Sequence, residues 1–138
     1  SAGVDSAVAA LKDAGARRAM PLPVSAPFHT PLMQPAAEVM QQAFEDVSWS
    51  SPQFPVVSNL DGSLQTNADS IRDSLVKQIS APVLWTACTA RLIEAGCSHF
   101  IECGPGKVLS GLSKRIDKSV PIKSIETVAA IKAGLTDL

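Results

Sequence analysis

The sequence predicts an α/β fold with a largely parallel sheet, because short strand patterns alternate with helical patterns along much of the chain. The chain has 138 residues, of which 46% are hydrophobic, as expected of one ordinary globular domain with a single core. Charged residues make up 18% of the chain, and its formal charge is -1. This composition argues against intrinsic disorder and against a nucleic-acid binder, which usually has a basic surface.

The first predicted helix spans residues 6–14, and either Asp5 or Ser6 can cap its N-terminus. Gly15 follows at a position where helices commonly end. Residues 16–24 then alternate as in a strand, and the prolines within them restrict this run to a sheet edge or a strand exit.

A rigid loop with two prolines spans residues 25–31. Within it, Thr30 followed by Pro31 makes a good start for the next helix. That helix is predicted over residues 31–45, where apolar side chains recur at helical spacing.

Residues 55–60 predict a short strand, and the following Asp61-Gly62 turn favours a brief hairpin. Thr66 and Asp69 then predict a capping box at the start of a third helix. This helix should end before the next proline.

The last part of the chain alternates between helices and strands. The predicted ranges are 86–95 (helix), 97–103 (strand), 120–125 (strand) and 127–136 (helix), with a further helix carrying Val108, Leu109, Leu112 and Ile116 between the two strands. This alternation is the main support for parallel strands.

His29 is the first candidate catalytic residue, because it lies in the proline-stiffened loop and outside any apolar stripe. An imidazole titrates near neutrality and can act as a general base toward a hydroxyl or a thiol when a neighbouring group orients its second ring nitrogen. A histidine that only braces the loop would fit the same position. A general base implies a nucleophile, yet the chain contains no Gly-x-Ser-x-Gly elbow.

Two other motifs match ligand sites less well. Cys97, His99 and Cys103 could suggest zinc, but one extended strand would hold them in a row without a fourth ligand, so packing is the better interpretation and no metal is predicted. Gly104-Pro105-Gly106-Lys107 lies between a strand and a helix, as a phosphate loop does. It lacks the first glycine and the last hydroxyl residue of a Walker A loop, so a tight turn is predicted instead.

Composition also bears on the compartment. No apolar run approaches the ~20 residues of a membrane-spanning helix, and the first residues lack the basic and apolar blocks of a signal peptide. Three cysteines cannot all pair with one another, which favours a reducing cytoplasm. The sequence therefore predicts a soluble cytoplasmic protein that binds neither membrane nor nucleic acid.

Three motifs occur in a fixed order: LPVSAPFHTPLM at 22–33, QISAPVLW at 78–85 and ECGPGKVLSGL at 102–112. Together they resemble the malonyl-CoA:acyl carrier protein transacylases of fatty acid synthesis and the related acyltransferase domains of polyketide synthases. The resemblance implies the C-terminal part of an α/β-hydrolase-like acyltransferase core with parallel strands, plus the tail of an inserted ferredoxin-like subdomain. Residues 1–23 would then be the tail of the insert, and residues 24–138 the returning part of the core.

The resemblance implies ping-pong transfer of malonyl from malonyl-CoA to the phosphopantetheine thiol of acyl carrier protein, without a further cofactor. His29 matches the family's base, and the main-chain carbonyl at Gln78 would orient it in place of a carboxylate. Phe28 would favour malonyl over methylmalonyl by crowding an α-methyl branch, and Val108 would line the substrate site. The family's nucleophilic serine precedes this region, so the N-terminal part of the same enzyme is an expected partner and the chain alone should be inactive.

Because carrier proteins are acidic, a basic rim is expected to guide docking. Its candidate residues are Arg17, Arg18, Lys114 and Arg115, although such pairs are often simply solvated. Two alternatives remain for the whole chain. One is an acyltransferase domain fragment of a polyketide or fatty acid synthase, and the other is a non-catalytic module that binds a carrier protein or a partner subunit.

Overall fold

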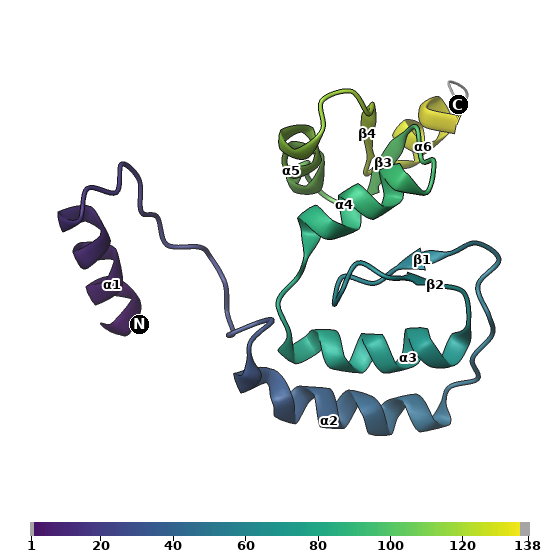
Figure 1. Cartoon of the computed structure of the whole chain (residues 1–138), viewed down its shortest axis with the longest axis horizontal. Coiled ribbons are helices and arrows are strands. Elements are labelled where there is room, and N and C mark those ends of the chain that lie inside the picture. Colours follow the sequence, from purple (N-terminus) through teal and green to yellow (C-terminus); the bar gives the residue numbers. More distant parts are fainter. Residues whose placement is uncertain (1, 136–138) are drawn as a thin grey trace.

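The computed structural model describes residues 2–135, which form helices and two small sheets (Figure 1). The helices are α1 (Ala2–Asp13), α2 (Gln34–Ala43), α3 (Ala68–Lys77), α4 (Trp85–Glu94), α5 (Val108–Ile116) and α6 (Val128–Leu135). The strands are β1 (Val56–Val57), β2 (Leu64–Gln65), β3 (Phe100–Cys103) and β4 (Ile122–Ile125). Short 3-10 turns extend α2 and α3, at Pro31–Met33, Phe44–Asp46 and Gln78–Ser80. None of the described helices is long and apolar enough to cross a membrane.

Strands β3 and β4 form a parallel pair, with Phe100 opposite Ile122 at one end and Cys103 opposite Ile125 at the other. Helix α5 connects them, because consecutive parallel strands need a crossover connection. The predicted α/β class with parallel strands is therefore confirmed. Both strands begin later than predicted, since Pro121 has no N–H with which to extend the ladder.

Strands β1 and β2 form the predicted hairpin and pair in antiparallel fashion. Asp61 Oδ1 accepts the N–H of Ser63 at 3.0 Å, and Gly62 adopts φ +73° in the turn. A Cβ placed on Gly62 would lie 3.2 Å from Cβ of Ala87 on α4. Glycine is therefore required here both by the left-handed backbone and by the close approach of the turn to α4.

Helix α1 begins at Ala2, earlier than the predicted start at residue 6. Both proposed caps, Asp5 and Ser6, lie inside the helix, where Ser6 Oγ donates to the carbonyl oxygen of Ala2 at 3.0 Å. The predicted end is confirmed, because Gly15 adopts the left-handed φ of +90° that closes many helices.

The predicted strand over residues 16–24 is wrong, since this segment runs as an irregular linker between α1 and α2 (Figure 1). Pro21 and Pro23 lack the N–H groups that a sheet ladder needs. The N–H of Val24 instead donates to the carbonyl oxygen of Leu22 at 2.8 Å, which makes a tight local turn. Alternating apolar side chains are thus not sufficient for a strand when prolines interrupt the pairing.

The remaining helices follow their predicted ranges with small changes at the ends. The helix over residues 31–45 is confirmed, with 3-10 turns at both ends. The capping box predicted at Thr66 and Asp69 is wrong by one residue, because Asn67 is the cap and its side chain accepts the N–H of Ser70 at 2.9 Å. Helices α4 and α6 correspond to the two later predictions, and residue 136 lies outside the described residues.

A buried carboxylate at the end of β3 anchors helix α5. Glu102 Oε1 accepts the N–H of Leu109 at 3.0 Å, and Glu102 Oε2 accepts the N–H of Ser110 at 2.9 Å and its hydroxyl at 2.5 Å. These bonds satisfy free N–H groups of the first helical turn and place a negative charge at the positive end of the helix. The Ser110 hydroxyl, helped by the two N–H groups, holds the pKa of the Glu102 carboxyl below its ordinary value.

The described residues bury little apolar surface. Their accessible area is 10019 Å², whereas a compact monomer of this mass would expose about 6,800 Å². Ala37 and Cys88 are the hydrophobic residues that are buried in the part of the chain that the structure describes. The expectation of one ordinary core is therefore wrong for this chain by itself. Exposed large apolar side chains include Leu22, Val24, Leu32, Val39, Phe54, Val108 and Val128.

We expect isolated residues 1–138 to self-associate, because exposed apolar faces and open strand edges are sites of association. Size-exclusion chromatography with light scattering would measure the mass, and binding of the dye ANS would report exposed apolar surface. A monodisperse monomer that binds no dye would contradict this expectation.

We expect Glu102→Gln to destabilise the protein at neutral pH and to have less effect in acid. The folded-state pKa of this carboxyl lies below its ordinary value of 4.5, so its contribution to stability is complete above that pH and is lost as the pH falls through the lowered pKa. The glutamine would also place an NH₂ group opposite one of the helix N–H groups, and two donors cannot hydrogen-bond to each other.

Thermal midpoints of the unmodified protein, compared with those of the variant from about pH 7 to about pH 3, would test this dependence. Equal destabilisation at every pH would mean that the charge of the carboxylate does not matter.

Candidate functional site

His29 has an unusual backbone conformation. Its φ is +58°, and among the described residues it is the one non-glycine residue with a positive φ. Pro27 and Pro31 stiffen the loop on either side, and Thr30 Oγ1 donates to the carbonyl oxygen of Pro27 at 2.7 Å. Sparsely populated backbone conformations of this kind persist where the surroundings hold them, and they cluster at functional sites.

The side chain of His29 is held by a carbonyl that is distant in sequence. His29 Nδ1 lies 3.0 Å from the main-chain oxygen of Gln78. A carbonyl oxygen only accepts hydrogen bonds, so Nδ1 carries the proton in this contact. The neutral ring then has its lone pair on Nε2, as a general base requires, and the side chain is exposed.

The accepting carbonyl lies at the C-cap of α3, where a 3-10 turn follows. The same oxygen also accepts the N–H of Ala81 at 3.4 Å, so its two lone pairs serve two donors at the helix end. A second contact joins the same turn to the start of α2, where Ser80 Oγ donates to Gln34 Oε1 at 3.2 Å. Together the two contacts fix the His29 loop against the end of α3.

The two proposed substrate-binding residues both expose their side chains. Phe28 directly precedes His29 and is 52% exposed. Val108 is the first residue of α5 and is 70% exposed. The structure therefore brings His29 and Gln78 together, and it leaves the side chains of Phe28 and Val108 open to further contacts.

The basic residues proposed for docking are all exposed. Arg17 and Arg18 lie in the linker after α1, where Arg18 Nε donates to the sulfur of Met20 at 2.8 Å. Lys114 and Arg115 lie in the last turn of α5, where cations are favoured by the helix dipole.

The segment around His99, which directly precedes β3, does not gather metal ligands. His99 Nδ1 lies 3.0 Å from Ser98 Oγ, and Cys97 and Cys103 are free thiols. Over residues 2–135, no group of three or more His, Cys, Asp or Glu side chains could hold a metal ion.

The loop Gly104-Pro105-Gly106-Lys107 has its anion-binding groups occupied by carboxylates. Glu102 takes the N–H groups of the first turn of α5, and Glu126 Oε2 accepts the N–H of Gly106 at 3.0 Å. A phosphate would have to displace two negative charges to bind here. The loop is therefore a strand-to-helix turn, and Lys107 is exposed to solvent.

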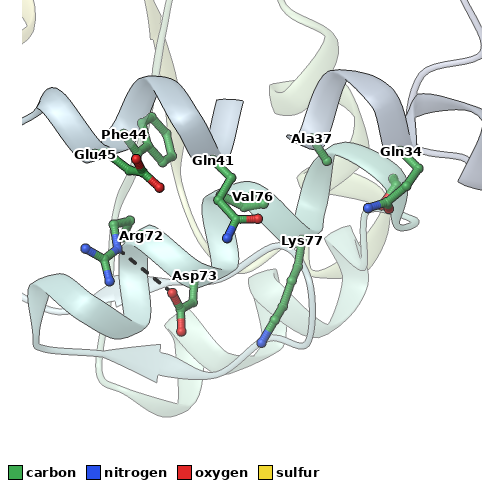
Figure 2. Close-up of a pocket in the computed structure, with 10 residues that line it drawn as sticks. Gln34, Ala37, Gln41, Phe44, Glu45, Arg72, Asp73, Val76 and Lys77 are labelled. Carbon is green, nitrogen blue, oxygen red and sulfur yellow. Dashed lines mark hydrogen bonds and ion pairs between the residues drawn. The ribbon is translucent and has the colours of Figure 1, made fainter. Parts of the chain in front are cut away.

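A groove of about 580 Å³ lies between α2 and α3 (Figure 2). Its lining residues are Gln34, Ala37, Gln41, Phe44, Glu45, Arg72, Asp73, Val76, Lys77 and Ser80. Arg72 Nε and Asp73 Oδ1 lie 4.0 Å apart on one wall. The groove approaches the candidate site through Gln34 and Ser80 but contains neither His29 nor Gln78.

Sequence reasoning missed the polar residues that support the site. Gln34 and Ser80 look like ordinary solvent-facing helix residues, and their contact depends on how α2 packs on α3. Glu102 carried a usable signal, because it is the one charged residue within the run from Cys97 to Cys103. A lone carboxylate in a buried strand pattern must have partners, and the start of the next helix could supply them.

Comparisons with known proteins agree with this geometry. No family model matches the chain. Malonyl CoA-acyl carrier protein transacylase of Salmonella typhimurium is 45% identical over 133 residues, which cover 96% of this chain and 43% of that protein. The chain thus spans less than half the length of the curated relatives that it matches.

Solved structures give the same result. Malonyl-CoA:acyl carrier protein transacylase (FabD) of Xanthomonas oryzae pv. oryzae superposes with a TM-score of 0.89 at 45% identity, over 99% of this chain and 44% of that chain. A malonyl-transacylase in complex with a type II polyketide synthase acyl-carrier protein has a TM-score of 0.87 at 40% identity, over 98% of this chain and 44% of that chain. In sequence and in fold, the chain is therefore homologous to the malonyl CoA-acyl carrier protein transacylases and matches their C-terminal part.

Proposed function

We propose that this chain is the C-terminal part of a cytoplasmic enzyme of fatty acid biosynthesis. That enzyme transfers malonyl from malonyl-CoA to the phosphopantetheine thiol of an acyl carrier protein. The observation that carries the proposal is the 3.0 Å contact between His29 Nδ1 and the main-chain oxygen of Gln78, which leaves Nε2 free as a base. The names of relatives at 45% identity support the pair of substrates. No cofactor beyond these substrates is proposed.

The nucleophile would be a serine in the N-terminal part of the enzyme, since no serine elbow occurs in these 138 residues. His29 Nε2 accepts the serine proton while the serine oxygen attacks the thioester carbonyl carbon. A C–O bond forms, the C–S bond to coenzyme A breaks, and His29 gives the proton to the leaving sulfur. The carrier thiol then gives His29 its proton and attacks the acyl-serine, and the proton returns to the departing serine oxygen.

Gln78 would act through its main-chain oxygen rather than its side chain. This oxygen keeps the proton of His29 on Nδ1 and stabilises the imidazolium that forms after Nε2 accepts a proton. The negative end of the α3 dipole adds to that stabilisation. A helix terminus would thus replace the carboxylate of a Ser-His-Asp triad.

Phe28 and Val108 are proposed to line the acyl site. Phe28 directly precedes the base, so its ring would restrict the space near the α-carbon of the acyl group. One extra methyl group is enough for a pocket to discriminate by roughly 10- to 200-fold. We therefore propose that malonyl is preferred over methylmalonyl.

We propose that residues 1–23 end an inserted ferredoxin-like subdomain and that residues 24–138 return to the acyltransferase core. Helix α1 supports this boundary, because it has no buried residue and stands apart from the other elements (Figure 1). The exposed apolar faces of the chain would then pack against the N-terminal part of the enzyme.

The proposed carrier-docking residues are Arg17, Arg18, Lys114 and Arg115. All four are exposed cations, as steering of an acidic partner requires. A related malonyl-transacylase has been captured in complex with an acyl-carrier protein, which supports a carrier protein as the partner.

Malonyl transfer to a phosphopantetheinylated carrier protein tests the activity in three preparations: this chain alone, the full-length protein, and the full-length protein with His29→Ala. We expect transfer by the unmodified full-length protein and none by this chain alone. The substitution should lower the rate by at least ~10²-fold, because a general base contributes roughly 10²- to 10⁴-fold.

Gln78→Ala is the matched control, since it keeps the main-chain oxygen and should keep most of the activity. Transfer by the chain alone would mean that the nucleophile lies within these residues, and the mechanism would be wrong.

Replacing both residues of either docking pair by alanine should raise the KM for the carrier protein by roughly two- to tenfold, because each exposed charge contributes modestly. The effect should fade at high salt, and hydrolysis of malonyl-CoA should be unchanged. The double variant Arg72→Ala/Lys77→Ala on α3 removes the same charge elsewhere and serves as the control. Equal loss of transfer and hydrolysis would count against docking at these residues.

A further inference from the structure

Two carboxylates hold the loop between β3 and α5. Glu102, the buried residue near the end of β3, binds the first turn of α5. Glu126, which directly follows β4, accepts the N–H of Gly106 at 3.0 Å through its Oε2. Ser124 Oγ donates to the carbonyl oxygen of Gly106 at 2.9 Å, so both polar backbone groups of this glycine are tied to the end of β4.

The loop adopts a left-handed backbone at its two glycines. Gly104 has φ +137° and Gly106 has φ +85°, and both lie in the region that side chains rarely adopt. A Cβ at either glycine would meet no atom within 4 Å, so crowding does not require the glycines. The loop is therefore shaped by its hydrogen bonds, while its outer side faces open space.

The loop also lies where α/β folds bind ligands. It follows the carboxyl end of β3 beside the carboxyl end of β4, and ligands of such sheets bind outside these ends. The loop leads directly into Val108, whose side chain is 70% exposed at the first position of α5. Val108 therefore lies between two fixed points, because Glu126 holds Gly106 on one side and Glu102 holds the N–H groups of Leu109 and Ser110 on the other.

We propose that Glu126 and Glu102 are positioning residues that clamp the loop 104–107 so that Val108 forms a rigid wall of the acyl site. This inference rests on the proposed function and deepens it, because it names the groups that set the size of the acyl pocket. The clamp acts on binding and on the choice of acyl group. It takes no part in proton transfer at His29.

Glu126 is the better residue for a test, because its side chain is exposed and its removal leaves no buried charge without a partner. Helix α6 does not need it as a cap, since Thr127 Oγ1 already accepts the N–H of Ala130 at 3.1 Å. Glu126→Gln keeps an oxygen that can accept the N–H of Gly106, whereas Glu126→Ala does not. Glu38→Ala, at an exposed position on α2, is the matched control for loss of a carboxylate.

The experiment uses the full-length protein and measures kcat and KM with malonyl-CoA and with methylmalonyl-CoA. For Glu126→Ala we expect the KM for malonyl-CoA to rise on the order of three- to tenfold, with a smaller change in kcat. The preference for malonyl over methylmalonyl should fall by a similar factor. Glu126→Gln should restore both values, and the thermal midpoints should match that of Glu38→Ala.

Hydrogen exchange at the Gly106 amide separates a failure of the clamp from a failure of the proposed function. Faster exchange of this amide in Glu126→Ala than in Glu126→Gln supports the clamp. This result is independent of the proposed function, which is wrong if the unmodified protein transfers no malonyl. Unchanged exchange overturns the clamp. Unchanged selectivity in an active Glu126→Ala protein overturns the role in acyl choice.

Discussion

The hydrogen bond from His29 to the main-chain oxygen of Gln78 is the constraint on which the candidate site depends. It joins a loop to a helix end across 49 residues of sequence and holds His29 at φ +58°. A left-handed backbone costs a non-glycine residue of order 1–3 kcal/mol, so a free loop would relax from it. The packing of α2 on α3, reinforced by the contact between Ser80 and Gln34, resists that relaxation. The orientation of the free Nε2 therefore rests on the packing of two helices.

Helix ends supply the electrostatics of this chain at two places. At the C-terminal end of α3, the main-chain oxygen of Gln78 accepts the Nδ1 proton of His29 and so orients the ring. The N-terminal end of α5 presents N–H groups to Glu102, which favours a negative charge on the carboxyl and lowers its pKa. The contacts of Glu102 satisfy N–H groups that the helix leaves without partners, whereas the oxygen of Gln78 also accepts the N–H of Ala81 at 3.4 Å. Helix ends thus orient a candidate base and close a potential phosphate loop.

The thin core of the chain is a consequence of its architecture. A pair of parallel strands has two faces and two edges to cover, and a crossover helix covers only part of them. Helix α1 contributes nothing to that cover, since none of its residues is buried. The exposed side chains of Leu32, Val39 and Val108 are therefore apolar surfaces that further protein would have to bury. Relatives more than twice as long as this chain have the residues to do so.

Local sequence determined the class of the fold, most helix ranges and the identity of the candidate base. These features depend on residues that are close in sequence. Apolar spacing predicts α2 and α5, Gly15 ends α1, and prolines mark the loop that carries His29. Local pattern failed at residues 16–24, where alternation predicted a strand but no partner strand could pair with prolines. Only the tertiary structure decided that Nδ1 meets the Gln78 carbonyl and that Glu102 caps α5, because such contacts depend on how distant segments pack.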